Sequence, residues 1–364
     1  MKEIFRLEDL QNLVLGATLM GTGGGGDPNR GLSRLKEVID SGKKINLINL
    51  NEMSKDKIIV VPYYVGSIAP TTQIKKSIKI ENTFEKAIEE MEKLLGTKVS
   101  GVVAGEIGGA NTPAALAISA KLGIPAIDGD LVGGRAAPEL HQCACHIFGI
   151  TECPSIIVTG TGNIVIIKQY ADIDDYESMI RHISMIGSNA IVVDTPMTWE
   201  SAVKAIIPGT ITRALNLGAV LSKSKIEENE RLREILNIMA GWKIFEGVVD
   251  KFMWSDEEGF LKGEIFIKGI NKYQDNILKS WIKNEHIMVF LNDKPIVMPP
   301  DSFALLKEDF TPITNTNLKV GMKVIGIASK AAKIWRSNEG LKYFGPKHFG
   351  FDYDYVPVED LVKG

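Results

Sequence analysis

The stretch "SGVVAGEIGGANTPAALAISAKLGIPAIDGD" (residues 100–130) decides the predicted fold class of this chain. Residues 100–109 contain an apolar run of the kind found in buried strands, and residues 111–123 have the pattern of a helix. Residues 124–130 return to a short apolar strand. Continuous apolar strands that alternate with helices are typical of parallel sheets covered by helices. We therefore expect a layered α/β domain around this stretch.

The same alternation extends in both directions from residues 100–130. The pattern predicts helices at 7–20, 27–42, 81–96 and 135–149, and strands at 44–50, 57–67 and within 155–170. Asp27 stands at the N-cap of the second of these helices, and Pro28 occupies its first position. The sequence therefore predicts an N-terminal three-layer α/β/α domain with a mixed or parallel sheet over residues 1–170.

The pattern changes after residue 171. Residues 171–241 are mostly helical, with one strand expected at 189–197. Short strands then follow one another around turns, at 242–254 and 260–269, at 285–298 around an Asn-Asp pair, and at 322–329. We therefore predict a C-terminal domain over residues 171–364, with helices at 171–241 and a β-barrel-like core at 242–340.

Composition excludes several classes of function. The chain has 364 residues and a formal net charge of −3, and its lysines and arginines are scattered rather than clustered. We therefore expect no nucleic-acid partner and no anionic membrane surface. No apolar run approaches the ~18 residues of a membrane span, and no signal peptide is recognisable. The three cysteines form no disulfide framework, which fits a reducing cytoplasm. A homo-oligomer is expected for a compact protein of this class.

Polar residues gather in the loops that follow two successive strands. They are Glu106, Asn111, Thr112, Asp128, Asp130, Arg135 and Glu139. In open α/β sheets, ligands bind beyond the carboxyl ends of the strands, so these side chains are candidates for one site. A structural interpretation stays open: Asn111 or Thr112 would cap a helix, and Arg135 and Glu139 would be an ordinary ion pair four residues apart on one helix.

The glycine run Gly23, Gly24, Gly25 and Gly26 is a second candidate. The segment before it is helical and no Gly-Lys-Ser/Thr follows, so neither a dinucleotide fingerprint nor a phosphate loop is present, and no nucleotide is expected. A flexible linker is disfavoured because apolar helices bracket the run. We interpret the four glycines as a backbone wall of a small-molecule pocket, with Asp27 fixing the helix that follows.

The cysteines lie with two histidines in "HQCACHIFGITEC" (residues 141–153). On a helix, His141 and Cys145 would share a face whereas Cys143 would point elsewhere, and the spacing is not that of a zinc motif. Buried apolar cysteines are therefore favoured, and a nucleophilic cysteine paired with histidine stays an alternative. Asn284, Glu285 and Asp301 lie at the edges of predicted β segments and are interpreted as turn formers.

Several motifs together resemble a known bacterial and archaeal family. They are "GTGGGGDP" (21–28), "AGEIGGAN" (104–111), "IDGD" (127–130), "GGRAAPELHQ" (133–142), "GTITRALNLG" (209–218), "KNEH" (283–286), "PPDS" (299–302) and "WRSNEGLKYFGPKHFGFDYDYVP" (335–357). In this order they are similar to the S-methyl thiohydantoin desulfurase family, which is associated with hydantoinase/oxoprolinase genes. The resemblance implies an α/β domain followed by a β-barrel-like one, and the conversion of an S-methyl thiohydantoin to a hydantoin and methanethiol.

On that resemblance, Asp128 or Asp130 is hypothesised as the base that activates water, with Glu106 as the acid or its partner. Arg135 and Asn111 would orient the ring, with Thr112 and Glu139 beside them, and the glycine run would donate to a ring carbonyl. A divalent metal on Asp128 and Asp130 is an open alternative, and the cofactor is otherwise unknown. Two competing functions are a catalytically silent, hydantoinase-associated binding subunit and a phosphate- or nucleotide-dependent cyclic amide hydrolase.

Overall fold

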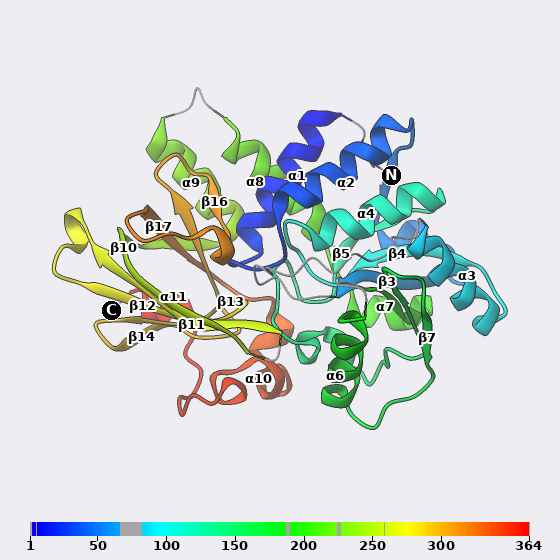
Figure 1. Cartoon of the computed structure of the whole chain (residues 1–364). Helices are drawn as coiled ribbons and strands as arrows, with labels where there is room; N and C mark the ends of the chain where they lie inside the picture. The colour runs from blue at the N-terminus through cyan, green and yellow to red at the C-terminus, as the bar shows by residue number, and fades with distance from the viewer. Residues whose placement is uncertain are drawn as a thin grey trace.

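The computed structural model describes residues 2–4, 6–65, 82–186, 190–223, 227–257 and 259–363. Parts of four predicted elements, at residues 66–67, 81, 187–189 and 224–226, and position 258 of a predicted turn lie outside these ranges. Two sheets form the frame of the molecule. In Figure 1 one sheet lies to the right beneath α1, α2 and α4, and the other lies to the left.

The first sheet is mixed, as the sequence predicts. Its strands are β1 (Lys2–Ile4), β2 (Ile45–Ile48), β3 (Ile58–Val65), β4 (Val99–Ala104), β5 (Ala126–Asp130), β6 (Ser155–Thr159), β7 (Ile164–Ile167), β8 (Ala190–Met197) and β9 (Ile207–Pro208). Their order is β1-β2-β5-β4-β3-β8-β6-β7, and β9 pairs with β5. The central pairs β2–β5, β5–β4 and β4–β3 are parallel. The loops after β4 and β5 therefore emerge at the same edge of the sheet.

Helices cover this sheet. They are α1 (Leu7–Met20), α2 (Pro28–Asp40), α3 (Thr83–Leu95), α4 (Asn111–Leu122), α5 (Ala144–Ile147), α6 (Ile173–Ser184), α7 (Trp199–Ala205) and α8 (Thr210–Leu221). Helix α9 (Glu228–Met239) packs instead on α8 and on the first strand of the second sheet. The predicted cap of α2 is confirmed, because the Asp27 side chain accepts a hydrogen bond from the amide of Asn29. Over the described ranges, no helix is both long and apolar enough to cross a membrane.

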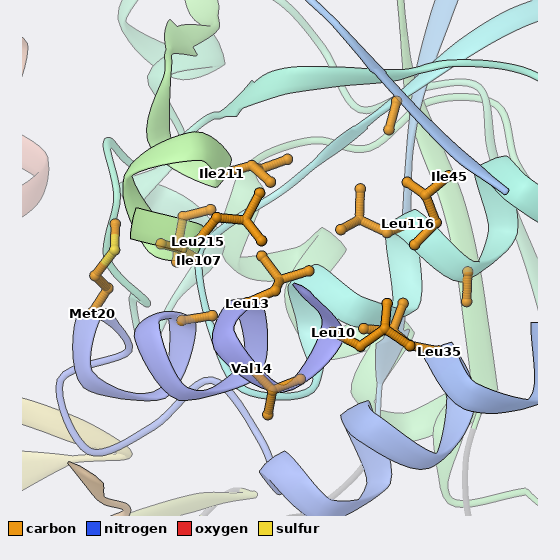
Figure 2. Packing of buried hydrophobic residues seen from close by; sticks show 14 of the residues in the cluster. Leu10, Leu13, Val14, Met20, Leu35, Ile45, Ile107, Leu116, Ile211 and Leu215 are labelled. Carbon is orange, nitrogen blue, oxygen red and sulfur yellow. The ribbon is translucent and has the colours of Figure 1, made fainter. Parts of the chain in front are cut away.

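Two glycines allow α1 and α8 to approach each other closely. A β-carbon on Gly16 would lie 1.8 Å from the carbonyl oxygen of Ala214, and one on Gly218 would lie 1.7 Å from that of Asn12. Any side chain larger than a hydrogen atom at position 16 or 218 would therefore push the two helices apart. Figure 2 shows the result, with leucines of α1 packed among apolar side chains of α2, α4 and α8.

The second sheet is antiparallel throughout. Its strands are β10 (Gly241–Glu257), β11 (Phe260–Gly269), β12 (Ile277–Lys283), β13 (Glu285–Leu291), β14 (Lys294–Val297), β15 (Ser302–Lys307), β16 (Pro312–Ile313) and β17 (Lys323–Ser329). The order β14-β13-β12-β11-β10-β17-β15-β16 leaves β14 and β16 at the two ends, so the strands described do not close into a barrel. Asn292 and Asp293 both have positive φ, which confirms the predicted Asn-Asp hairpin turn. The C-terminal helices α10 (Asn338–Phe344) and α11 (Val358–Leu361) complete the fold.

Strand pairing crosses the predicted division of the chain at residue 170. Strand β8 lies between β3 and β6 in the first sheet, and α8 packs on α1. Strands β8 and β9 and helix α8 therefore extend the N-terminal layers beyond residue 170. The division into residues 1–170 and 171–364 stays a prediction.

The predicted helix at 135–149 is wrong for most of its length. Only α5 (Ala144–Ile147) is α-helical there, preceded by a short 3₁₀ turn at Leu140–Gln142. The amides of Ala137 and Leu140 donate to the carboxylates of Glu106 and Glu177 instead of to carbonyls of the preceding turn. Tertiary hydrogen bonds thus replace those of the helix. Arg135 and Glu139 consequently do not share a helix face, and the predicted ion pair between them is not formed.

Candidate functional site

A cavity of about 210 Å³ lies where the loops of the first sheet meet the start of β13. Its walls come from β3, from the loops after β4 and β5, from α6 and β8, and from Asn284 and Glu285. Of the predicted site residues, five line it: Gly25, Gly26, Glu106, Asn111 and Glu139. The volume is below the ~300–1,000 Å³ of pockets for drug-sized ligands, so it suits a small molecule.

Glu106 stands just beyond the end of β4 and is held from two sides. Its carboxylate accepts hydrogen bonds from the amide of Ala137 (2.8 Å) and from the side chain of Asn111 (2.5 Å). Burial raises the pKa of Glu106 to about 7, against these two hydrogen bonds, which favour the ionised form. The Thr112 hydroxyl donates to the main-chain oxygen of Glu106 and so fixes the turn. Near neutral pH this carboxyl group is poised to take up or release a proton.

Glu285 also brings a carboxyl group to the cavity, and it comes from the other sheet. It is the first residue of β13 and is 2% exposed. Among the described residues its Oε2 has no hydrogen-bond partner. Burial and the nearby Glu106 carboxyl raise the pKa of Glu285 well above its usual range, which favours its protonated form. Two carboxyl groups with raised pKa values, Glu106 and Glu285, thus face one cavity.

The glycine run is bent by positive φ at Gly23, Gly25 and Gly26. The carbonyl oxygen of Gly25 accepts hydrogen bonds from the amides of Ala110 and Asn111 at the start of α4. Gly25 and Gly26 line the cavity, whereas Gly23 packs against Asn315, which lies between β16 and β17 of the second sheet. The run is therefore an ordered junction between α1, α4 and the second sheet, with one part facing the cavity.

The carboxylates of Asp128 and Asp130 both accept hydrogen bonds from neighbouring residues of the protein. The Asp128 carboxylate accepts from the amide and the hydroxyl of Thr212, at 2.9 and 2.6 Å, in the first turn of α8. The buried Asp130 carboxylate accepts from the amides of three successive residues, Val132, Gly133 and Gly134. Neither aspartate is among the residues that line the cavity. Their predicted catalytic and metal-binding roles stay predictions, while these contacts give both a structural role.

Arg135 is buried between the two sheets, at 2% exposure. Its guanidinium donates to the main-chain oxygens of Ala136, Pro300 and Asp301, and it lies over the ring of Phe344. Burial lowers the pKa of Arg135 to about 10, against the attraction of Glu285 and other carboxylates nearby. Arg135 therefore places a fixed positive charge close to Glu106 and Glu285.

Glu139 lies at another edge of the cavity, in contact with Lys283 and His348. Burial acts to raise the pKa of Glu139, but the hydrogen bonds from His348, Lys283 and Gln142 outweigh it and lower the pKa below its usual range. Glu139 is therefore ionised. Its role in substrate binding stays a prediction, since both oxygens already accept hydrogen bonds within the protein.

A buried acid lies beneath the cavity on β8. Asp194 accepts hydrogen bonds from the hydroxyls of Tyr63 (2.6 Å) and Tyr176 (2.7 Å). Burial raises the pKa of Asp194 to about 7, against these hydrogen bonds. The next residue, Thr195, has φ of 49°, which is a rare conformation for a β-branched residue. Both residues line the cavity, and backbone strain of this kind is concentrated at functional sites.

The cysteine segment forms a cluster that the helical interpretation disfavoured. Cys143, His146 and Glu152 have ligand atoms that all lie within 4.8 Å of one another. His146 Nε2 lies 2.7 Å from Glu152 Oε1, and Cys143 and Glu152 line the cavity. Because α5 is only one turn long, Cys143 lies outside it and can point toward His146. Cys145 is fully buried, as predicted for an apolar cysteine.

Sequence reasoning missed Glu285 because it stands at the edge of a β segment, where polar residues usually form turns. The signal that could have found it is its place in "NEHIMVF", where a glutamate opens an otherwise apolar strand. Asp301 is likewise no simple turn former. It is buried and accepts from the amide of Ala331, the guanidinium of Arg336, the hydroxyl of Tyr355 and the amide of Val358. It fastens the C-terminal segment to the second sheet.

Comparison with known proteins gives two family matches and a similar solved structure. The family described as S-Me-THD-like, N-terminal domain, matches residues 8–169, and S-Me-THD-like, C-terminal domain, matches residues 171–358. A structural-genomics crystal structure of a protein from Chromobacterium violaceum has a TM-score of 0.78 at 20% identity, covering 98% of this chain and 100% of that one. At this identity the likeness shows a shared fold. No curated protein matches the chain.

Proposed function

The chain belongs to the S-methyl thiohydantoin desulfurase (S-Me-THD-like) family, and on that premise we propose that it hydrolyses a thiohydantoin-like ring. The S-methyl group on the ring would be replaced by water, which gives a hydantoin and methanethiol. The observation that carries this proposal is the pair Glu106 and Glu285, two buried carboxyl groups that line one small cavity. Hydrolysis at a carbon–nitrogen double bond requires both a base and an acid.

Glu106 is assigned as the base, because its pKa of about 7 leaves a large ionised fraction at neutral pH. It takes a proton from water as the oxygen attacks the ring carbon that bears the methylthio group. Glu285, whose raised pKa favours the protonated form, gives its proton to the adjacent ring nitrogen. The carbon–sulfur bond then breaks, and its electron pair leaves with sulfur. Glu285 recovers the hydroxyl proton as the carbonyl forms, and Glu106 returns its proton to methanethiolate.

This assignment moves the base from Asp128 or Asp130 to Glu106. The carboxylates of the two aspartates already accept hydrogen bonds from backbone amides, and they do not line the cavity. A base must reach the water that it activates. Asn111 and the amide of Ala137 act as positioning groups, because they hold the Glu106 carboxylate.

The test is to measure release of methanethiol and hydantoin from an S-methyl thiohydantoin by the purified chain. Glu106→Gln should fold normally and lower kcat by ~10²–10⁴, the usual contribution of a general base. Glu308→Gln is the matched control, because Glu308 is exposed and pairs only with Lys323 among the ion pairs described. Full activity of Glu106→Gln would overturn the assignment. Ligand-dependent stabilisation without turnover would instead favour the silent hydantoinase-associated subunit.

A further inference from the structure

Cys143, His146 and Glu152 bring three different metal-ligating groups together at the wall of the cavity. A thiol, an imidazole nitrogen and a carboxylate oxygen all lie within 4.8 Å of one another. The closest approach joins His146 Nε2 and Glu152 Oε1 at 2.7 Å. A metal ion could replace the proton that this contact shares, with a small outward movement, because zinc binds nitrogen and oxygen at ~2.0–2.2 Å.

The local fold makes this cluster from residues that a continuous helix would separate. Helix α5 ends in a turn in which the amide of Ile150 bonds to the carbonyl of Cys145 and that of Gly149 to the carbonyl of His146. Gly149 adopts the left-handed conformation that such a turn requires. The chain reverses there and returns Glu152 to His146.

Glu152 is held in place as a metal ligand would be. Its side chain is 4% exposed, and Tyr170 donates its hydroxyl to the Oε2 atom. The main-chain oxygen of Glu152 accepts from the amide of Thr195, the residue with strained backbone at the cavity. Outer hydrogen bonds of this kind fix the orientation of ligating carboxylates.

A second group, Glu139, His141 and His348, has comparable distances but is less suited to a cation. The ammonium group of Lys283 already contacts Glu139, and His348 occupies its other oxygen. A metal ion would have to displace a positive charge. Among the ion pairs described, no lysine or arginine neutralises Glu152.

We propose that Cys143, His146 and Glu152 bind a zinc ion whose fourth position opens into the cavity. Three protein ligands and one open position form the usual catalytic zinc site, and a sulfur, nitrogen and oxygen set suits zinc better than magnesium or calcium. Cys143 and Glu152 line the same cavity as Glu106 and Glu285. The ion would therefore face the bound substrate.

The role of the ion rests on the proposed function. The reaction releases a thiolate, and zinc binds thiolates strongly. As the carbon–sulfur bond breaks, the electron pair on methanethiolate coordinates the open position of zinc. The proton from Glu106 then releases methanethiol, and water returns to the site. Zinc thus stabilises the leaving group, while the two glutamates move the protons.

Metal binding is tested apart from activity. The full chain, treated with a chelator and dialysed, is titrated with Co²⁺ and then Zn²⁺. We expect one Co²⁺ per chain, with the near-ultraviolet absorption of a cobalt–thiolate bond, and displacement by Zn²⁺. Cys143→Ala should lose this absorption and His146→Ala should weaken binding more than tenfold. Cys153→Ala, the matched control outside the cluster, should retain both. Tyr170→Phe should weaken binding ~10–100-fold.

The outcomes test the metal site and its role in catalysis separately. Absence of Co²⁺ and Zn²⁺ binding in the folded wild-type chain, or a cobalt–thiolate band that persists in Cys143→Ala, would overturn the site. Turnover of S-methyl thiohydantoin that is equal in the metal-free and zinc-loaded chains would overturn the role in catalysis. Zinc binding with no turnover in any form would leave the site standing and reject the proposed function. Glu106→Gln should bind Co²⁺ like the wild type.

Discussion

The carboxylate of Glu285 lies directly against the α-carbon of Gly24. A β-carbon at position 24 would come within 1.8 Å of Glu285 Oε1. The contact joins the loop after α1 to the first residue of β13, and so joins the two sheets at the cavity. This contact explains why position 24 is a glycine: only a residue without a side chain leaves room for the buried carboxyl group of Glu285.

We predict that Gly24→Ala will lower both stability and activity. Its added methyl group must displace the Glu285 carboxyl, and overpacking of this kind costs ~1–3 kcal/mol. The free energy of unfolding, from urea titration, and kcat/KM for S-methyl thiohydantoin measure the two effects. We expect kcat/KM to fall more than tenfold, because the acid is misplaced.

Gly42→Ala is the control for this prediction. Gly42 has φ of +80° but nothing within 4 Å of an added β-carbon. The substitution should cost about 1 kcal/mol of stability through backbone strain alone and leave kcat/KM unchanged. Equal kcat/KM in Gly24→Ala and the wild type would contradict the role given to Glu285.

The activity should depend on pH through Glu106. Because its pKa in the folded chain is about 7 and the base must be ionised, kcat/KM should rise tenfold per pH unit below pH 7 and level off above it. A pH series between 5 and 9 measures this limb. The residual activity of Glu106→Gln should not show this rise of kcat/KM with pH. A limb that is unchanged in this variant would assign the titration to another group.

Asp130→Asn should mainly destabilise the fold. The Asp130 carboxylate accepts from three backbone amides, and an asparagine would place an NH₂ group against at least one of these donors. We expect a loss of about 1–3 kcal/mol in the free energy of unfolding. Chemical denaturation monitored by circular dichroism measures it. An Asp130→Asn variant with wild-type stability and no turnover would restore the earlier hypothesis that Asp130 is catalytic.

Local sequence signals predicted most of the elements. The Asp27 cap, the strand–helix–strand of residues 100–130 and the Asn292-Asp293 turn depend on neighbouring residues, and all three are present. The helix predicted at 135–149 failed because amides of that segment bond to carboxylates distant in sequence. The pairing of β8 inside the first sheet is also long-range, and no local pattern encodes it.

The candidate site was predictable on one side only. Glu106 and Asn111 follow a strand end, where sites of α/β sheets are expected. Glu285 reaches the cavity through contact between the two sheets, and the pairing of Cys143 with Glu152 requires the turn at Gly149. Asp128 and Asp130 also lie at the end of a strand, β5, but their carboxylates face backbone amides. Sequence position alone does not distinguish these two orientations.

Asp194→Asn should change how stability depends on pH. The carboxyl is 2% exposed and its pKa in the folded chain is about 7, above the ordinary value of 3.8. The folded state therefore holds a proton that the unfolded state has lost. This contribution to stability is complete below about pH 4 and is lost as pH rises to about 7; it is worth on the order of 4 kcal/mol.

Urea titrations at pH 4.5 and 7.5 measure the difference. Asn keeps the partners of Tyr63 and Tyr176 without titrating, so the variant should lose less stability between these pH values than the wild type. An equal loss in both would show that Asp194 is ionised in the folded protein.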